Sequence, residues 1–305
     1  MKLQYFRGDQ PNFGDELNPW IWPQLLPGFF DENPDELFIG IGSIIGAPYA
    51  PSAKKIVAGA GYVQSYHSQV PDVHGADWDV FFVRGPRTAH LLGVPENLGI
   101  GDAATLLRAL DRKFYREPRY IGFIPHWESM QRGNWKVACE LAGIRLIDPR
   151  TPVERVIAEI LGCEMLIAEA MHGAIVADTL RVPWLPVLPI DGAHRSKWLD
   201  WADTLGLKLR QRRLWPSSLG EGLKLHQNRL RPSGPAATGT MYRPSIARQT
   251  VSQLAKPFIA YVAAQRLSFL AKRDPCLSPE SVTDNTVNKM LEKIRNLERK
   301  YKKAG

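Results

Sequence analysis

The architecture can be read from AEAMHGAIVADTLRVPWLPV, the sequence of residues 168–187. It follows an apolar run at residues 164–168 that predicts a buried strand, and its own pattern predicts a helix that begins at about Met171. Glu169 and His172 therefore stand where the carboxyl end of a strand meets the N-terminus of a helix. Ligands bind at such positions in open α/β sheets.

Strand and helix patterns alternate on both sides of this segment. A charged, polar connection at residues 111–118 separates two sets of such patterns. The alternation predicts an α/β fold with two Rossmann-like, doubly wound domains that face a cleft. The expected parts are an N-terminal domain at residues 1–113, a C-terminal domain at residues 114–206 and a basic, partly helical extension at residues 207–305.

The composition is that of a globular protein without a membrane span. Of the 305 residues 44% are hydrophobic, and no run of about 18 uncharged apolar residues occurs. The N-terminus lacks the apolar core of a signal peptide, and the three cysteines have no disulfide or metal-ligand spacing. We therefore expect a cytoplasmic protein with reduced thiols.

The positive charge is concentrated in the last third of the chain. Residues 1–206 hold 19 Lys and Arg against 25 Asp and Glu, whereas residues 207–305 hold 20 against 6. Nucleic acid and an anionic membrane face are the usual partners of such a region, and a solvated tail is the third possibility. Residues 251–271 predict a helix with one apolar face that either packs on the body or lies on a membrane, and residues 287–303 predict a charged, solvated helix.

A turn at residues 12–15 precedes a helix rich in Trp and Leu. Gly14 permits the backbone to approach a ligand closely, and Asn12 can hydrogen-bond the turn. Asp15 stands at an N-cap position, a role that does not exclude a catalytic one. Glycine-rich turns elsewhere match neither a GxGxxG that opens a helix nor a P-loop, so the signal for a nucleotide is weak.

Two further segments offer cations. In the sequence RGPRT, Arg84 and Arg87 are placed to converge on an anion at the N-terminus of a predicted helix. Surface pairing of both arginines with Asp or Glu is the alternative. A second cationic cluster, again at the start of a predicted helix, consists of His194, Arg195 and Lys197.

The order of several motifs gives the chain a family resemblance. These motifs are NFGDELN, GAG at residues 59–61, VRGPRT, GDAATLL, IPHW and AEAMHGAIVADTLRVPW. Over residues 3–205 the chain resembles the polysaccharide pyruvyl transferase family, and above all the branch found in bacterial exopolysaccharide gene clusters. The resemblance implies a GT-B-like fold, phosphoenolpyruvate as the donor co-substrate, and a pyruvate ketal formed on a sugar of a lipid-linked repeat unit.

The resemblance also implies roles for residues. Arg84 matches the family arginine that binds the phosphate or carboxylate of the donor, and His172 matches the histidine of the family's Arg-Leu-His motif. Met171 takes the leucine position of that motif, whereas Ala170 stands where the motif has arginine. The missing cation is expected to come from a side chain elsewhere, which is Arg195, Lys197 or Arg87.

Forming the ketal requires an acid, a base and a site for anions. The methylene carbon of the donor is protonated, a sugar hydroxyl attacks the cationic centre, and phosphate leaves as the second hydroxyl closes the ring. His172 is the expected acid because a nearby phosphate would favour its protonated form, and His126 is the alternative acid. Glu169 or Asp15 is the expected base. We expect no metal and no cofactor besides the co-substrate.

Two other functions stay open. A GT-B-type glycosyltransferase would use a nucleotide sugar, with an acidic residue such as Glu169 or Asp191 on the ribose. A nucleic-acid-binding protein is disfavoured, since the basic region has few interleaved aromatic residues and no recognised motif. The expected partners are phosphoenolpyruvate, a polyprenyl-diphosphate-linked saccharide and the anionic inner membrane face, but not nucleic acid. The aromatic side chains expected to stack on sugars are Trp20, Trp22 and Trp127.

Overall fold

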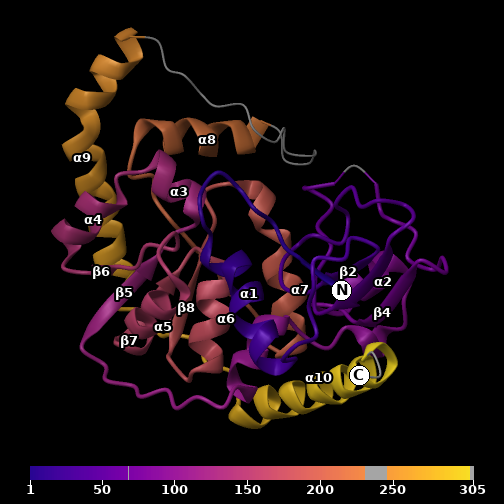
Figure 1. The fold of residues 1–305 in the computed structure, drawn as a ribbon. Coiled ribbons are helices and arrows are strands. Elements are labelled where there is room, and N and C mark those ends of the chain that lie inside the picture. Colours follow the sequence, from indigo (N-terminus) through magenta and orange to yellow (C-terminus); the bar gives the residue numbers. More distant parts are fainter. Residues whose placement is uncertain (68, 231–245, 303–305) are drawn as a thin grey trace.

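The computed structural model describes residues 1–67, 69–230 and 246–302, and it holds two parallel β-sheets (Figure 1). The first sheet has four strands in the order β1-β2-β3-β4. These strands are β1 (Lys2–Gln4), β2 (Glu36–Ile39), β3 (Lys54–Ala58) and β4 (Trp78–Phe82). The central strands β2 and β3 are short and almost wholly buried, as is typical of parallel sheets covered on both faces.

The second sheet has the strand order β6-β5-β7-β8-β9, and all its pairs are parallel. Its strands are β5 (Tyr120–Ile124), β6 (Arg145–Leu146), β7 (Cys163–Ala168), β8 (Trp184–Leu188) and β9 (Arg212–Arg213). The strand order reverses between β5 and β7, as in doubly wound folds of the 2-1-3-4-5 type. Such a reversal opens a crevice at the carboxyl ends of these two strands.

Helices connect the strands and cover the sheets. The α-helices are α1 (Phe13–Leu25), α2 (Pro86–Leu92), α3 (Trp127–Arg132), α4 (Trp135–Ala142), α5 (Val153–Leu161), α6 (Met171–Thr179), α7 (Ser196–Thr204), α8 (Leu219–Leu230), α9 (Ile246–Leu270) and α10 (Glu280–Tyr301). The 3-10 helices are η1 (Glu96–Leu98), η2 (Ala103–Ala109) and η3 (Gly192–His194). The predicted helix start at Met171 is therefore confirmed.

Helix α6 lies at the centre of the molecule and joins its two halves (Figure 1). It contacts α1 and η2 from the first half and α5, β7 and β8 from the second. A side chain at Gly173 would place its Cβ 2.6 Å from Cγ2 of Ile124, so glycine lets α6 begin directly against β5. The apolar core is continuous across this helix, with Phe38 of β2 and Leu166 of β7 in one cluster.

These features confirm the predicted α/β class with two parallel sheets. The GT-B-like likeness and the domain boundaries stay predictions. The connection at residues 111–118 has no regular secondary structure, and its Tyr115 is exposed, in keeping with its polar sequence.

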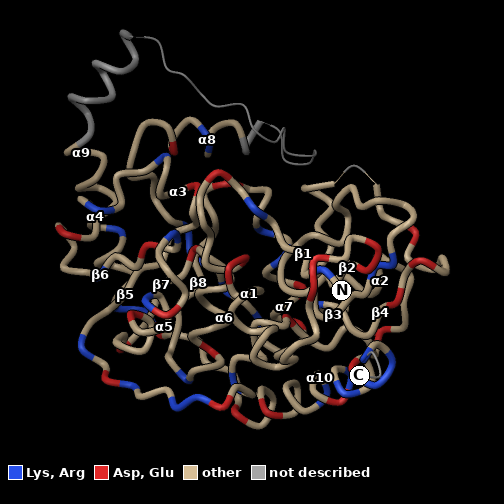
Figure 2. Tube along the Cα trace, in the orientation of Figure 1, with Lys and Arg blue, Asp and Glu red and all other residues tan. Residues whose placement is uncertain are grey.

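The last two helices pack on the body of the protein. Helix α9 contacts α4, and it buries Ala263, Ala264 and Leu267. Helix α10 contacts η2 and β4, and it buries Met290 and Leu297 while charged residues of both signs lie along it (Figure 2). The expectation that this final helix is solvated is wrong for its inner face, because its apolar residues recur at helical spacing. Within the described ranges, none of the helices combines the length and the apolar character that a membrane span needs.

Candidate active site

The candidate site lies at the carboxyl ends of β5 and β7, where the strand order of the second sheet reverses. The N-termini of α1 and α6 meet there and enclose a narrow pocket, which we call the histidine pocket. It is lined by Asn12, Phe13, Gly14, His126, Pro149, Ala170, Met171, His172 and Lys197. The fold thus brings together six of the residues predicted for the site, namely Asn12, Gly14, His126, Met171, His172 and Lys197.

His172 is held between the two halves of the molecule. The backbone of Gly14 lies against its ring so closely that a Cβ at this position would be 2.0 Å from Nδ1. Close approach to the His172 ring is therefore the reason for glycine here, and the predicted approach to a ligand stays a prediction. The Nε2 atom of His172 lies 3.5 Å from Oδ2 of Asp102, and neither atom has a hydrogen-bond partner among the described residues.

Asp102 is the functional candidate that sequence reasoning missed. Its Oδ1 accepts the Ala104 N–H at 3.0 Å, so the carboxylate caps η2 while Oδ2 faces the histidine. Burial alone would raise the pKa of Asp102, but His172, the Ala104 N–H and Arg84 together lower it. The carboxylate is therefore ionised, and its Oδ2 faces the ring of His172. The motif GDAATLL held this residue, and only its capping role was evident from the sequence.

The predicted base Glu169 is buried behind the pocket, with 1% of its surface exposed. Its Oε2 accepts the His126 N–H at 2.9 Å, while Oε1 accepts the Ile190 N–H at 2.8 Å and the Ser129 hydroxyl at 2.9 Å. Burial raises the pKa of Glu169 although these hydrogen bonds lower it. Three donors thus occupy the carboxylate, and through the His126 N–H it holds the backbone of His126 in place. Glu169 does not line the histidine pocket.

His126 lines the histidine pocket and belongs to a hydrogen-bonded and stacked network of side chains. Its ring stacks on that of His194 with centroids 3.9 Å apart, and His194 is hydrogen-bonded to Glu128 at 2.7 Å through Nε2 and to the Tyr66 hydroxyl at 2.5 Å through Nδ1. Burial lowers the pKa of His126 well below its usual value, and the neighbouring His194, Lys197, Arg132 and His172 lower it further. His126 is therefore neutral near pH 7.

Ligating atoms of His126, Glu128 and His194 lie within 4.8 Å of one another, which is close enough to hold a metal ion. The Oε2 atom of Glu128 is already hydrogen-bonded to His194 at 2.7 Å and to Arg132 at 2.9 Å. A metal ion would have to displace both bonds in a site that is rich in cations. The residues fit a hydrogen-bonded network better than a metal centre, and the prediction of no metal stays untested.

Lys197, near the start of α7, supplies the positive charge of the histidine pocket. Its Nζ atom lies 5.9 Å from the centre of the Tyr66 ring. Within the described ranges of the chain, no carboxylate pairs with this ammonium group and no acceptor hydrogen-bonds it. Burial lowers the pKa of Lys197 to about 8, and the nearby Arg84 contributes to the shift. A half-buried cation without a partner favours an anionic ligand.

Arg84 does not reach the pocket, because the protein itself occupies its guanidinium group. The side chain is fully buried, with Nε 3.0 Å from Oδ2 of Asp200, Nη1 2.6 Å from the Ser43 hydroxyl and Nη2 3.3 Å from the Tyr62 carbonyl. The ion-pair alternative holds for this arginine, except that the pair with Asp200 is buried and not at the surface. A Cβ at Gly61 would lie 2.1 Å from Cζ of Arg84, which leaves no room beside the guanidinium.

The other two predicted cations also point elsewhere. Arg87 is half exposed and pairs with Asp203 at 2.6 Å, as in the alternative of a surface pair. Arg195 donates from both Nε and Nη2 to the Pro189 carbonyl at 3.2 Å. Of the three side chains expected to compensate for Ala170, Lys197 is therefore the one that shares a pocket with it.

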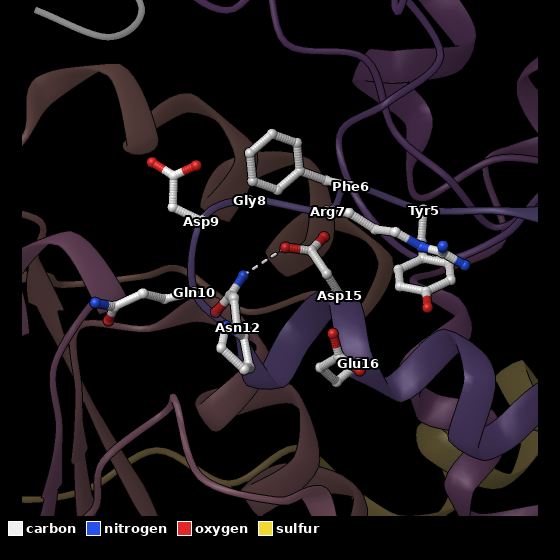
Figure 3. Close-up of a pocket in the computed structure, with 10 residues that line it drawn as sticks. Tyr5, Phe6, Arg7, Gly8, Asp9, Gln10, Asn12, Asp15 and Glu16 are labelled. Carbon is white, nitrogen blue, oxygen red and sulfur yellow. Dashed lines mark hydrogen bonds between the residues drawn. The ribbon is translucent and has the colours of Figure 1, made fainter.

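Asp15 does not line the histidine pocket, but it is hydrogen-bonded to Asn12, which does. The residue is not the N-cap of α1, since the cap position is Asn12 and Asp15 is the third residue of the helix. Its Oδ2 accepts from Nδ2 of Asn12 at 2.6 Å, and burial raises its pKa above the usual value. Asp15 lines a second, larger cavity of about 350 Å³, which we call the loop cavity because residues 5–12 form most of its wall (Figure 3).

The tryptophans expected to stack on sugars are mostly engaged elsewhere. Trp22 is fully buried in the core, and Trp20 donates its Nε1 to Glu154 at 2.6 Å. Trp127 begins α3 and is half-buried, but it lines neither of the two cavities.

Comparison with known proteins identifies a relative of this chain. The chain is 41% identical over 221 residues to the succinoglycan biosynthesis protein ExoV of Rhizobium meliloti (strain 1021), and the match covers 70% of this chain and 68% of that protein. No family model and no solved structure matches.

Proposed function

The chain belongs to the polysaccharide pyruvyl transferase family, and on this premise we propose that it is a transferase of exopolysaccharide biosynthesis. It transfers pyruvate from phosphoenolpyruvate to two hydroxyl groups of a sugar, which forms a cyclic ketal and releases phosphate. Its fold is GT-B-like, with the donor between the two halves. The observation that carries the proposal is Lys197, a half-buried ammonium without a partner that lines the same pocket as His172.

Donor binding relies on the positive character of the histidine pocket. Lys197 provides a full charge, and the N-terminus of α6 adds a partial positive charge from its free N–H groups. Lys197 thereby takes over the contact that the family arginine would make from the position of Ala170. The pocket holds about 20 Å³, which is room for about one water molecule. The donor must therefore displace the Lys197 side chain when it enters the pocket. The ammonium group of Lys197 then contacts the phosphate or carboxylate of the bound donor.

His172 is the acid of the reaction. Asp102 faces its Nε2 and stabilises the imidazolium, which gives a proton to the methylene carbon of the donor. That carbon becomes the methyl group, and the neighbouring carbon becomes the electrophile that a sugar hydroxyl attacks. Asp15 accepts the proton of the attacking hydroxyl, and its raised pKa makes it a stronger base than an exposed aspartate. The second hydroxyl displaces phosphate, which leaves with the remaining proton.

The structure gives the nucleotide-sugar alternative less support. A glycosyltransferase would need a free acidic residue for the ribose, and Glu169 is saturated by three donors. Asp191 accepts the Ala193 N–H at 3.1 Å and pairs with Lys224 at 2.8 Å. Neither carboxylate is therefore free to take a ribose hydroxyl.

Thermal unfolding with ligands tests the proposed donor. Phosphoenolpyruvate at about 100 times its dissociation constant should stabilise the protein by about 2.7 kcal/mol. The variant Lys197→Ala should lose this stabilisation, whereas Arg87→Ala, which removes a cation outside the pocket, should keep it. Stabilisation by UDP- or GDP-sugars and not by phosphoenolpyruvate would overturn the proposal in favour of a glycosyltransferase.

The acceptor that we propose is linked to polyprenyl diphosphate, so the enzyme works at an anionic membrane face. The outer face of α9 exposes Phe258, Tyr261 and Phe269. The guanidinium of Arg266 lies 5.0 Å from the Phe269 ring centre, and that of Arg273 lies 3.8 Å from it. Aromatic side chains combined with arginines are typical of surfaces at a membrane interface.

Vesicle flotation tests this membrane contact. The wild-type protein should float with vesicles that contain phosphatidylglycerol and sink with vesicles of phosphatidylcholine alone, because the basic region is attracted to anionic lipid. Replacing Phe258, Tyr261 and Phe269 together by alanine should abolish flotation without unfolding the protein, since all three side chains are exposed. Equal flotation of the variant and the wild type would exclude α9 as the contact.

A further inference from the structure

The loop cavity borders the histidine pocket, and Asn12 lines both. Its wall consists of residues 5–12, which follow β1, and of the first turn of α1 (Figure 3). Its volume of about 350 Å³ falls at the lower end of the range of about 300–1,000 Å³ that is usual for small-molecule sites. The cavity is therefore large enough for a ligand of its own beside the donor.

The charge of the loop cavity is opposite to that of the histidine pocket. Three carboxylates line it, from Asp9, Asp15 and Glu16, against the single guanidinium of Arg7. That guanidinium lies 4.6 Å above the centre of the Tyr5 ring. A phosphorylated, carboxylated donor is repelled from such a wall. A neutral ligand with several hydroxyl groups is suited to it, because carboxylate oxygens accept hydrogen bonds from hydroxyls.

Phe6 adds an apolar surface to this polar wall. Phe6 is 49% exposed, whereas phenylalanine is more often buried than exposed in folded proteins. The backbone of Gly8 lies directly against the ring, since a Cβ at Gly8 would be 3.0 Å from Cε1 of Phe6. The glycine thus lets the ring rest on the loop while a substantial part of its surface stays open. An exposed aromatic ring among hydrogen-bond acceptors is a suitable platform for the C–H face of a pyranose.

Asp15 connects the two sites. Asn12 donates to its Oδ2 at 2.6 Å, and no side chain or N–H group in the described ranges donates to its Oδ1. From the loop cavity, Oδ1 is therefore available to a hydroxyl group of a bound ligand. The same residue is the base that the proposed reaction needs.

We propose that the loop cavity is the acceptor subsite and binds a neutral pyranose, with Phe6 stacked on the sugar ring and Asp15 bonded to the hydroxyl that attacks. This inference rests on the proposed pyruvyl transfer for the identity of the reaction. The binding itself does not require it, because a pyranose occupies the cavity through Phe6 and the carboxylates alone. Donor and acceptor then lie on either side of Asn12, and the attacking hydroxyl approaches the donor from the side of α1.

Saturation-transfer NMR tests the subsite with defined probes, namely methyl β-D-galactopyranoside and methyl β-D-glucopyranoside. The wild-type protein should transfer saturation to the ring protons of at least one glycoside. In Phe6→Ala the dissociation constant should rise by about fivefold, as the loss of an aromatic contact implies. The control Tyr115→Ala removes an exposed aromatic ring from the connection at residues 111–118, outside both cavities, and should bind like the wild type.

The outcomes separate this inference from the proposed function. Equal binding by Phe6→Ala and the wild type, or the absence of transfer to both glycosides in the wild type, would overturn the subsite. Competition between the glycoside and phosphoenolpyruvate would also overturn it, because the two ligands are assigned to separate cavities. If the glycoside binds through Phe6 but phosphoenolpyruvate fails to stabilise the protein, the subsite stands and the donor assignment fails.

Discussion

Replacing Arg84 distinguishes a structural arginine from a donor-binding one. The guanidinium has no exposed surface, and Asp200 beside it is nearly as buried, so Arg84→Met leaves a buried carboxylate without its cation. Breaking a buried ion pair in this way typically costs about 3–5 kcal/mol. For a chain of this length such a loss lowers the midpoint of thermal unfolding by about 5–8 °C. We expect the folded variant to bind phosphoenolpyruvate with unchanged affinity.

The assay combines a double-mutant cycle with ligand binding. Stability is measured by denaturant unfolding for Arg84→Met, Asp200→Asn and the double variant. The asparagine retains an oxygen for the Thr88 N–H, which donates to Asp200 at 3.0 Å. The double variant should therefore lose less stability than the sum of the single losses, by more than about 1 kcal/mol. If Arg84→Met instead keeps wild-type stability and loses phosphoenolpyruvate binding, Arg84 is a donor-binding residue and not a structural one.

Three further predictions concern charge and proton transfer. The affinity for phosphoenolpyruvate, measured by titration calorimetry, should decrease as the pH rises through about 8, because Lys197 loses its proton there. In Lys197→Arg this decrease in affinity should occur only at a higher pH, because arginine keeps its charge. Asp15→Asn should lower kcat by about 10²–10⁴-fold and leave the thermal stabilisation by phosphoenolpyruvate intact; an unchanged rate would exclude it as the base. Glu221 of α8 is fully buried and accepts a hydrogen bond from Nε1 of Trp135 at 2.7 Å. Burial raises its pKa to about 8, so its protonated form stabilises the fold at low pH, and this stability is lost as the pH rises through about 8. Glu221→Gln should flatten that dependence in chemical unfolding, and an equally steep curve would contradict it.

The fold class and the position of the site follow from local sequence patterns. Strand β7 and helix α6 were predictable because an apolar run followed by small residues fixes both the strand and the close start of the helix. His172 and Glu169 were then located by the rule that ligands bind at the carboxyl ends of parallel strands. The rule locates both residues but does not say which of them faces the pocket. That depends on Ser129 and Ile190, whose donors occupy Glu169 from other elements.

The pairings that define the chemistry join residues far apart in the sequence, which is why periodicity does not reveal them. Arg84 meets Asp200 across 116 positions, and His172 meets Asp102 across the two halves of the molecule. A sequence contains many carboxylates that could pair with each cationic side chain, and the fold decides which pairs form. A buried cation that pairs with a carboxylate of the protein is not available to a ligand, whereas an unpaired one is available. Arg84 is an example of a paired cation, and Lys197 is an example of an unpaired one. Ala170 stands where the related motif has arginine, and the nearby positive charge comes instead from Lys197 of α7, a half-buried lysine that pairs with no carboxylate of the described residues.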